Sequence, residues 1–139
     1  MRKLTIFIFA MLLFASCKRT YISTTGFKTE ELTDVKFYKT GANYGAINEG
    51  DTVSSTYKFK NSGSNDLVIT KIEVSCGCTF PDYPKKPVKP GQEDSLIVRF
   101  ASNGKLDRQV GRLVFYMNTK PEDHEIILEG IVKPKKNIK

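Results

Sequence analysis

Residues 53–60 read Val-Ser-Ser-Thr-Tyr-Lys-Phe-Lys, and this stretch decides the expected fold. Val53, Ser55, Tyr57 and Phe59 occupy every second position, and the residues between them are polar. Successive side chains of a β-strand point to opposite faces, so this spacing places the large apolar side chains on one face, against a core. We therefore expect a half-buried strand here.

The same alternation recurs along the chain, at residues 35–38, 96–100, 113–117 and 126–132. Turn-forming pairs such as Pro90-Gly91 and Asn103-Gly104 separate these runs. We expect no helix longer than one turn. About seven short strands over roughly 100 residues predict an all-β fold, an immunoglobulin-like β-sandwich.

Two segments depart from simple alternation. In residues 67–76 the apolar positions change parity, which predicts either a bulge near Thr70 or Lys71 or a strand buried on both faces. Prolines then recur at nearly regular spacing, and this pattern predicts an extended, stiff connector rather than a strand interior. They are Pro81, Pro84, Pro87 and Pro90.

The N-terminus has the pattern of a secretory signal peptide over residues 1–16. Two basic residues, Arg2 and Lys3, precede an apolar run over residues 4–14. That run is shorter than the ~20 residues needed to span a bilayer. The small residues before Cys17 resemble the lipobox of bacterial lipoproteins, which implies cleavage before Cys17 and its modification by fatty acyl chains such as palmitate. The alternative is a plain secreted protein with an incidental cysteine.

The expected organisation follows from this leader. The lipidated Cys17 would begin a flexible tether over residues 17–33, the β-sandwich would occupy residues 34–133, and a basic tail would follow over residues 134–139. Residues 18 and 19 are Lys and Arg, and the resemblance to lipoprotein sorting signals implies the outer membrane, with the domain facing the periplasm.

Length and charge exclude several other classes of protein. A chain of 139 residues is too short for a barrel of alternating strands and helices, which needs ~250 residues. The formal net charge is +7, but the basic residues are scattered and lack a groove interleaved with aromatic residues, so we expect no nucleic-acid partner. The tail could bind anionic lipid or a cell-wall polymer, although a solvated chain end is the default interpretation.

Cys76-Gly77-Cys78 is the most distinctive motif after the leader. The two cysteines are expected to be a structural disulfide or a pair of buried thiols. The alternatives are thiol–disulfide exchange through a small, easily reduced ring, or binding of copper by two sulfur atoms. A tetrahedral zinc site would need two further ligands, and the only histidine, His124, is expected to be exposed beside a turn. No catalytic constellation is evident.

Several short motifs occur in an order that resembles a known bacterial family. They are Tyr44–Asp51 (YGAINEGD), Phe59–Gly63 (FKNSG), Cys76–Thr79 (CGCT), Pro87–Gln92 (PVKPGQ), Asn103-Gly104-Lys105, Gly111, Asn118 and Leu128-Glu129-Gly130. From about residue 34 to residue 133 the chain resembles the domain of unknown function 1573 family, which is common in exported Bacteroidetes proteins. The resemblance implies an immunoglobulin-like sandwich related to domains that act in assembly and interaction. Asp107-Arg108-Gln109 stands where the family often has a glycine, which is expected to lengthen that hairpin.

These observations lead to two functional hypotheses. The first is a non-enzymatic envelope lipoprotein whose domain binds another envelope protein or supports envelope assembly, for example by strand addition at a sheet edge. It requires no cofactor. The alternative is a periplasmic copper-binding or thiol-redox protein that acts through Cys76 and Cys78.

Overall fold

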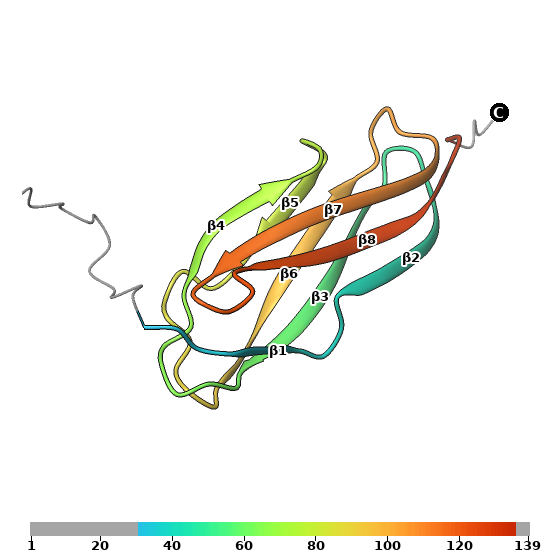
Figure 1. Cartoon of the computed structure of the whole chain (residues 1–139). Helices are drawn as coiled ribbons and strands as arrows, with labels where there is room; N and C mark the ends of the chain where they lie inside the picture. The colour runs from blue at the N-terminus through green and yellow to red at the C-terminus, as the bar shows by residue number, and fades with distance from the viewer. Residues whose placement is uncertain (1–30, 136–139) are drawn as a thin grey trace, which may run out of the picture.

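The computed structural model describes residues 31–135, so the expected signal peptide and Cys17 lie outside the described residues. Eight strands form two four-stranded sheets that pack face to face (Figure 1). The first sheet contains, in spatial order, β1 (Val35–Phe37), β3 (Thr52–Asn61), β6 (Glu93–Ala101) and β5 (Thr79–Asp82). The second contains β2 (Gly41–Asn48), β8 (Asp123–Lys133), β7 (Asp107–Met117) and β4 (Ile69–Val74). The expected all-β sandwich is confirmed, with eight strands.

Neighbouring strands are antiparallel except β2 and β8, which are parallel. Residues 31–135 contain no helix that is both long enough and apolar enough to cross a membrane. Asp107, which replaces the family's glycine, begins β7 with a φ of 64°. This left-handed conformation is the one that glycine adopts without strain, whereas few other residues adopt it.

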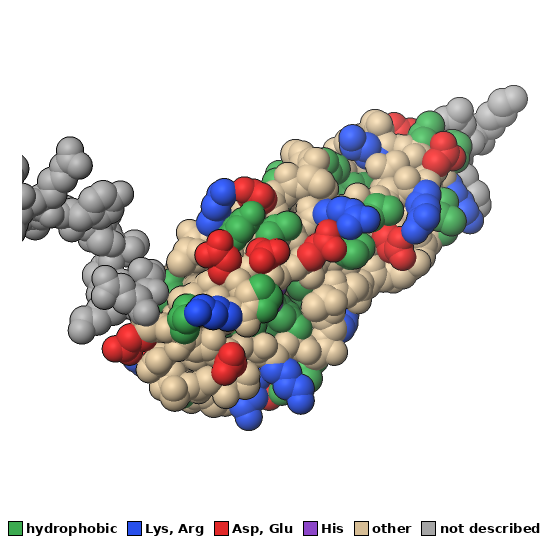
Figure 2. Space-filling model, viewed as in Figure 1, with side chains coloured by type: hydrophobic (Ala, Val, Ile, Leu, Met, Phe, Trp, Pro, Cys, Tyr) green, Lys and Arg blue, Asp and Glu red, His purple; other side chains and the backbone are tan. Residues whose placement is uncertain are grey.

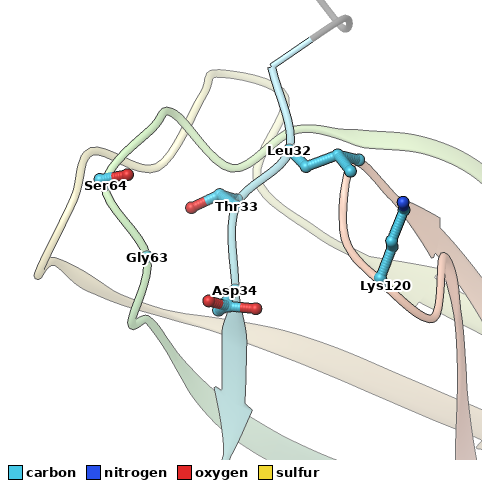
Figure 3. A pocket seen from close by; sticks show the side chains of 6 residues that line it. All are labelled: Leu32, Thr33, Asp34, Gly63, Ser64 and Lys120. Carbon is cyan, nitrogen blue, oxygen red and sulfur yellow. The ribbon is translucent and has the colours of Figure 1, made fainter.

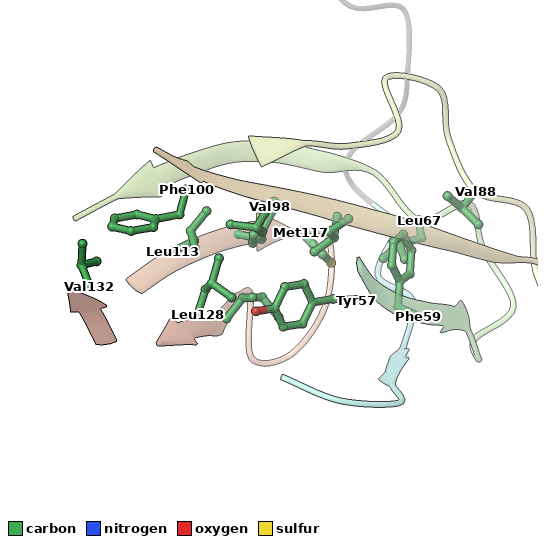
Figure 4. Packing of buried hydrophobic residues seen from close by; sticks show 13 residues of the cluster. Tyr57, Phe59, Leu67, Val88, Val98, Phe100, Leu113, Met117, Leu128 and Val132 are labelled. Atoms are coloured by element: carbon green, nitrogen blue, oxygen red, sulfur yellow. The ribbon is translucent and has the colours of Figure 1, made fainter. Parts of the chain in front are cut away.

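The alternating apolar side chains meet between the two sheets (Figure 4). Tyr57 and Phe59 of β3 are completely buried, and Phe100 and Leu128 from opposite sheets are 3% and 2% exposed. Each such side chain contributes about 1.5–3 kcal/mol when it leaves water. The core comprises Tyr57, Phe59, Leu67, Val88, Leu96, Val98, Phe100, Leu113, Phe115, Met117, Ile126, Leu128 and Val132.

One polar group also joins the sheets across this core. The hydroxyl of Tyr57, on β3, donates a hydrogen bond of 2.8 Å to the carbonyl oxygen of Ile127, on β8. A buried tyrosine needs such a partner for its polar end while its ring fills apolar space. The bond fixes the position of β3 against β8 in addition to the apolar packing.

The parity change in residues 67–76 is a bulge, as expected. Pairing between β4 and β7 shifts register between Ile69 and Lys71, so Thr70 is the extra residue. Leu67, before the bulge, pairs in an isolated bridge with Val88. The proline segment differs from the prediction in one respect, because Pro81 lies within strand β5. β5 is at the edge of its sheet, where a residue without an N–H is tolerated.

The domain begins before the alternating pattern does. The hydroxyl of Thr33 donates to Asn61 Oδ1 at 2.9 Å, and Thr33 is buried. Asn61 Nδ2 donates to the carbonyl oxygen of Val88, and Asn118 Nδ2 donates to the carbonyl oxygen of Glu31, both at 2.8 Å. Residues 31–33, which the sequence assigned to the tether, are therefore fixed to one end of the sandwich by side-chain amides.

Tyr44, on β2, covers the end of β8 where Gly130 leaves room for it. The Tyr44 ring stacks on Phe100, with ring centroids 5.6 Å apart. A Cβ atom at Gly130 would overlap the Tyr44 ring and lie 2.6 Å from the carbonyl oxygen of Gly45. Gly130 is thus required by close approach, not by its backbone angles.

We expect Gly130→Ala to lower the free energy of unfolding by about 1–3 kcal/mol, because the added methyl group overpacks this contact. Gly41→Ala is the matched control, since a Cβ there meets nothing within 4 Å. Denaturant unfolding of the two variants and the unmodified chain measures the difference. Equal stability of the two variants would contradict this account of the Tyr44 contact.

His124 is half-buried, not exposed as the sequence suggested. Its Nε2 lies 2.7 Å from the hydroxyl oxygen of Thr119, and its ring centroid lies 5.6 Å from that of Phe37. The Thr119 hydroxyl donates to the carbonyl oxygen of Pro121, so it accepts from His124 Nε2–H. Burial lowers the pKa of His124 below its ordinary value of 6.5, and the nearby Asp123 only partly opposes this.

The lowered pKa gives stability a sign with pH. The unfolded chain takes up a proton on His124 at higher pH than the folded chain does, so the histidine's contribution is present above about pH 6.5 and falls as pH drops below it. We expect the loss of unfolding free energy between pH 7.5 and pH 5.0 to be smaller in His124→Gln than in the unmodified chain. Parallel pH profiles from denaturant unfolding would show that the prediction is wrong.

Candidate functional site

The two sheets have four edge strands: β1 and β5 in the first sheet, and β2 and β4 in the second. An edge strand leaves alternate backbone N–H and C=O groups without a partner in its own sheet. Such a row of groups can pair with a strand from another chain, unless the edge is short, bulged or lacks donors. The sequence analysis proposed strand addition without naming an edge, and the four edges differ in this respect.

Two of the edges are poor templates for strand addition. β1 has only three residues. β2 is interrupted by a register shift between Asn43 and Ala46, where Gly45 has a φ of 74°. Side chains also occupy two of its donors, because Gly45 N–H donates to Asn43 Oδ1 and Asn48 N–H donates to Asp51 Oδ2. A short strand and a bulged strand are common ways in which proteins protect an edge.

β5 is closed by its own sequence. Ala101 N–H donates to the carbonyl oxygen of Cys78, so alternate residues from Cys78 onward face β6, and Thr79 and Pro81 face away. The N–H of Thr79 is already bonded to the carbonyl oxygen of Cys76, and Pro81 has no N–H. This edge therefore offers an incoming strand no donor at Thr79 or Pro81.

β4 is the open edge of the described part of the chain. Ser75 N–H donates to the carbonyl oxygen of Arg112 on β7, at 2.9 Å. By the alternation of an antiparallel ladder, Lys71 and Glu73 also face β7, so the backbone groups of Ile72 and Val74 point away from the sheet. No backbone hydrogen bond from another described element reaches either residue. Ile72 and Val74 thus offer two N–H and two C=O groups.

The side chains of β4 divide between two faces. Ile72 and Val74 pair with the inward-facing Phe115 and Leu113, yet Val74 is 42% exposed because no strand lies beyond it. Lys71 and Glu73 point outward, with side chains 61% and 50% exposed. An added strand would therefore meet apolar surface on one side and charged groups on the other.

The two outward charges contact each other. Lys71 Nζ lies 2.5 Å from Glu73 Oε1, and the hydroxyl of Tyr116 donates to Glu73 Oε2 at 3.2 Å. The hydrogen bond from Lys71 lowers the pKa of Glu73, and the same bond raises the pKa of Lys71. Both groups are consequently charged at neutral pH.

The Cys-Gly-Cys motif forms the corner between β4 and β5, where the chain passes from one sheet to the other. A disulfide joins Cys76 to Cys78, and both residues are half-buried. Since neither sulfur has a proton in this form, the hydroxyl of Thr79 is the donor in its 3.3 Å contact with Cys76 Sγ. Thr79 itself is buried.

The corner presents no metal site in this form. Both sulfur atoms are bonded to each other and cannot act as thiolate ligands. Among residues 31–135, no group of three or more His, Cys, Asp or Glu side chains is arranged to hold a metal ion. The chemistry available at the corner is attack of a thiolate on the disulfide.

Pockets contribute little to the site. A hollow of about 210 Å³ lies where the N-terminal segment passes the loop after β3, and Figure 3 shows Thr33 beside Gly63 and Ser64 there. A second, of about 320 Å³, is lined by Tyr38, Lys39, Thr56 and Lys58. Neither brings together a nucleophile and a base, so the candidate site is a surface.

The outer face of the second sheet carries ion pairs between its strands. Arg108 and Glu129 are 2.8 Å apart, and Arg112 and Glu125 are 2.9 Å apart. Figure 2 shows acidic and basic side chains next to each other along this face, with apolar side chains between them. Exposed pairs of this kind contribute at most about 1 kcal/mol each, and they leave the face nearly neutral.

The fold and its edges define the class of this protein, an immunoglobulin-like β-sandwich of the PapD-like type with one open edge strand. More particularly, the chain belongs to the family described as protein of unknown function (DUF1573), whose model matches residues 35–132. No curated protein matches the sequence. The family resemblance seen in the motifs is confirmed over this range.

Solved structures share the fold at low identity. A protein of unknown function from Porphyromonas gingivalis W83 superposes with a TM-score of 0.64 at 12% identity, over 76% of this chain and 50% of that one. The ASH/PapD-like domain 7 of human CEP192 superposes with a TM-score of 0.60 at 10% identity, over 76% and 89%. The secreted serine protease VesC from Vibrio cholerae gives 0.55 at 11%, over 75% and 24%. The chain spans half of the P. gingivalis protein, and these likenesses define the fold alone.

Proposed function

We propose that this domain is a non-enzymatic binding module of the bacterial envelope that accepts a strand from a partner protein at the β4 edge. The observation that carries the proposal is the pair of unsatisfied backbone groups at Ile72 and Val74, beside three edges that are short, bulged or without donors. Each main-chain hydrogen bond to an added strand contributes about 0.5–1.5 kcal/mol.

The side chains beside this edge support the same function. Val74 is exposed and apolar, so a partner residue packed against it would leave water together with Val74. Lys71 and Glu73 would select the polar face of the added strand by charge. Main-chain bonds would thus supply affinity, and alternate side chains would supply specificity.

The proposed location is the periplasmic face of the outer membrane, with Cys17 lipidated. What supports it is the apolar leader and the small residues before Cys17. Acyl chains on Cys17 would anchor the protein, since each buried CH₂ contributes about 0.8 kcal/mol. The described domain begins at residue 31, at the end of the sandwich where β4 starts, and β4 runs away from that end (Figure 1).

Val74→Pro tests the backbone donor. Proline removes the open N–H of Val74 but no bond to β7, so we expect partner capture from envelope extracts to fall at least fivefold. Val74→Ala is the control, because it removes the apolar side chain and keeps the N–H. Affinity capture with quantitative mass spectrometry measures both, after thermal unfolding has confirmed that the two variants are folded.

Two results would count against strand addition. If Val74→Pro captured the same proteins as the unmodified chain, the β4 edge would not be the binding site. If Val74→Ala lost as much binding as Val74→Pro, the contact would depend on the side chain and not on the backbone.

A second candidate function is thiol–disulfide exchange at the corner. The observation that favours it is the half-buried disulfide with the Thr79 hydroxyl bonded to Cys76 Sγ. A thiolate of a partner dithiol would attack Cys78 Sγ, forming a mixed disulfide and releasing the Cys76 thiolate, which the Thr79 hydroxyl would stabilise. The partner's second thiol would then displace Cys78, so the partner is oxidised by two electrons and both cysteines are reduced. The reduced pair is also the form in which copper could bind.

Thr79→Val tests this step. It removes the hydroxyl and retains the shape, so we expect reduction by dithiothreitol to slow about fivefold, as the loss of one hydrogen bond of about 1 kcal/mol implies. Thr79→Ser, which keeps a hydroxyl, should react at nearly the unmodified rate. Quenching by alkylation followed by mass spectrometry gives the rates, and identical rates for Val and Ser would exclude a role for the hydroxyl.

A further inference from the structure

The charges on β4 point to a particular partner for its open edge. Lys71 and Glu73 flank Ile72 and project from the same outward face. When two identical strands pair antiparallel about a central residue, the residue before the centre lies opposite the residue after it. Pairing centred on Ile72 would place Lys71 of each copy directly across from Glu73 of the other.

We propose that the β4 edge binds a second copy of this chain, antiparallel and centred on Ile72. This inference rests on the proposed function, because it uses the same backbone groups. The N–H and C=O groups of the two Ile72 residues would form a reciprocal pair of hydrogen bonds, since both face away from β7. The two second sheets would then join into one continuous sheet across the two-fold axis.

The charges also select this register over its neighbour. Pairing centred on Glu73 would use the backbone groups of Ile72 and Val74 equally well, but it would place the two Glu73 carboxylates opposite each other. Like charges directly across a ladder are destabilising, and opposite charges are stabilising. Centred on Ile72, the four charges alternate in sign around the axis, and each Lys71 keeps its contact with the Glu73 of its own strand.

The inward side of the strand supports the same arrangement. Ile72 of each copy would lie opposite Ile72 of the other, and the exposed side chain of Val74 would be covered by the added strand. The three closed edges restrict where such pairing can occur, so the assembly would stop at a dimer instead of extending into a fibre. The open edge is thus consumed by a closed, symmetric contact.

Charge exchange tests the proposal directly. Lys71→Glu gives a copy with two acidic groups at the edge, and Glu73→Lys gives a copy with two basic groups. Each variant alone would place like charges opposite each other, whereas a mixture of the two would pair opposite charges again. We expect self-association of each single variant to weaken at least fivefold and the mixed pair to recover association close to that of the unmodified chain.

Full chains with two different C-terminal tags, co-expressed and extracted in detergent, give the measurement as the fraction of one tag recovered with the other. Recovery for the mixed pair only, with loss in both single variants, supports the proposal. Equal recovery in all combinations, or none for the unmodified chain, overturns it. Thermal unfolding of each variant distinguishes a weakened contact from a weakened fold.

The same variants separate this inference from the proposed function. If Val74→Pro abolishes capture of a different envelope protein while the charge exchanges change nothing, the edge binds a strand of another protein and the homotypic pairing is wrong. If Val74→Pro has no effect on either measurement, strand addition at β4 itself is wrong. The charge exchanges leave the backbone donors intact, so the two failures give different results.

Discussion

The constraint on which the whole structure depends is the burial of one face of each sheet against the other. Every strand that contributes to the core does so through alternate residues, so a shift of one residue would turn its apolar side chains into solvent. Tyr57 and Phe59 of β3 lie on the same side as Phe100 of β6 for this reason. The hydrogen bond from Tyr57 to Ile127 adds a polar contact between sheets that tolerates no slip. The faces are thereby fixed, and variation is confined to edges and corners.

The edges show how this freedom is limited. β1 is short, β2 is bulged and has two donors bonded to side chains, and β5 lacks a free donor at Thr79 and Pro81. These are different physical solutions to the same problem, the exposure of unpaired backbone groups. β4 uses none of them between Lys71 and Val74, although its bulge lies just before that segment. An open edge in a sandwich whose other edges are closed is what gives the proposed binding site its specificity.

Much of the fold follows from local pattern, whereas the site does not. Alternation in residues 53–60 predicts the buried Tyr57 and Phe59, and the change of parity predicts the bulge at Thr70, because both depend on neighbours in sequence. Thr33 is buried through bonds to distant asparagines, and His124 through contact with Phe37, which no local pattern records. Strand order is also non-local, so the sequence cannot show that β4 and β5 are edges. Pro81 is the one local hint, because proline is excluded from central strands.

The disulfide corner connects the two ends of this argument. It begins two residues after Val74 and ends just before β5, so one short loop terminates the open edge and begins the closed one. The carbonyl oxygen of Cys76 closes β5 by accepting from Thr79, and that of Cys78 holds the corner to β6 by accepting from Ala101. A strand added beside Val74 would lie next to the disulfide, so a thiol carried by that strand would be delivered to it. Strand addition and thiol–disulfide exchange are therefore chemically compatible uses of one corner, and the backbone edge is the feature that both require.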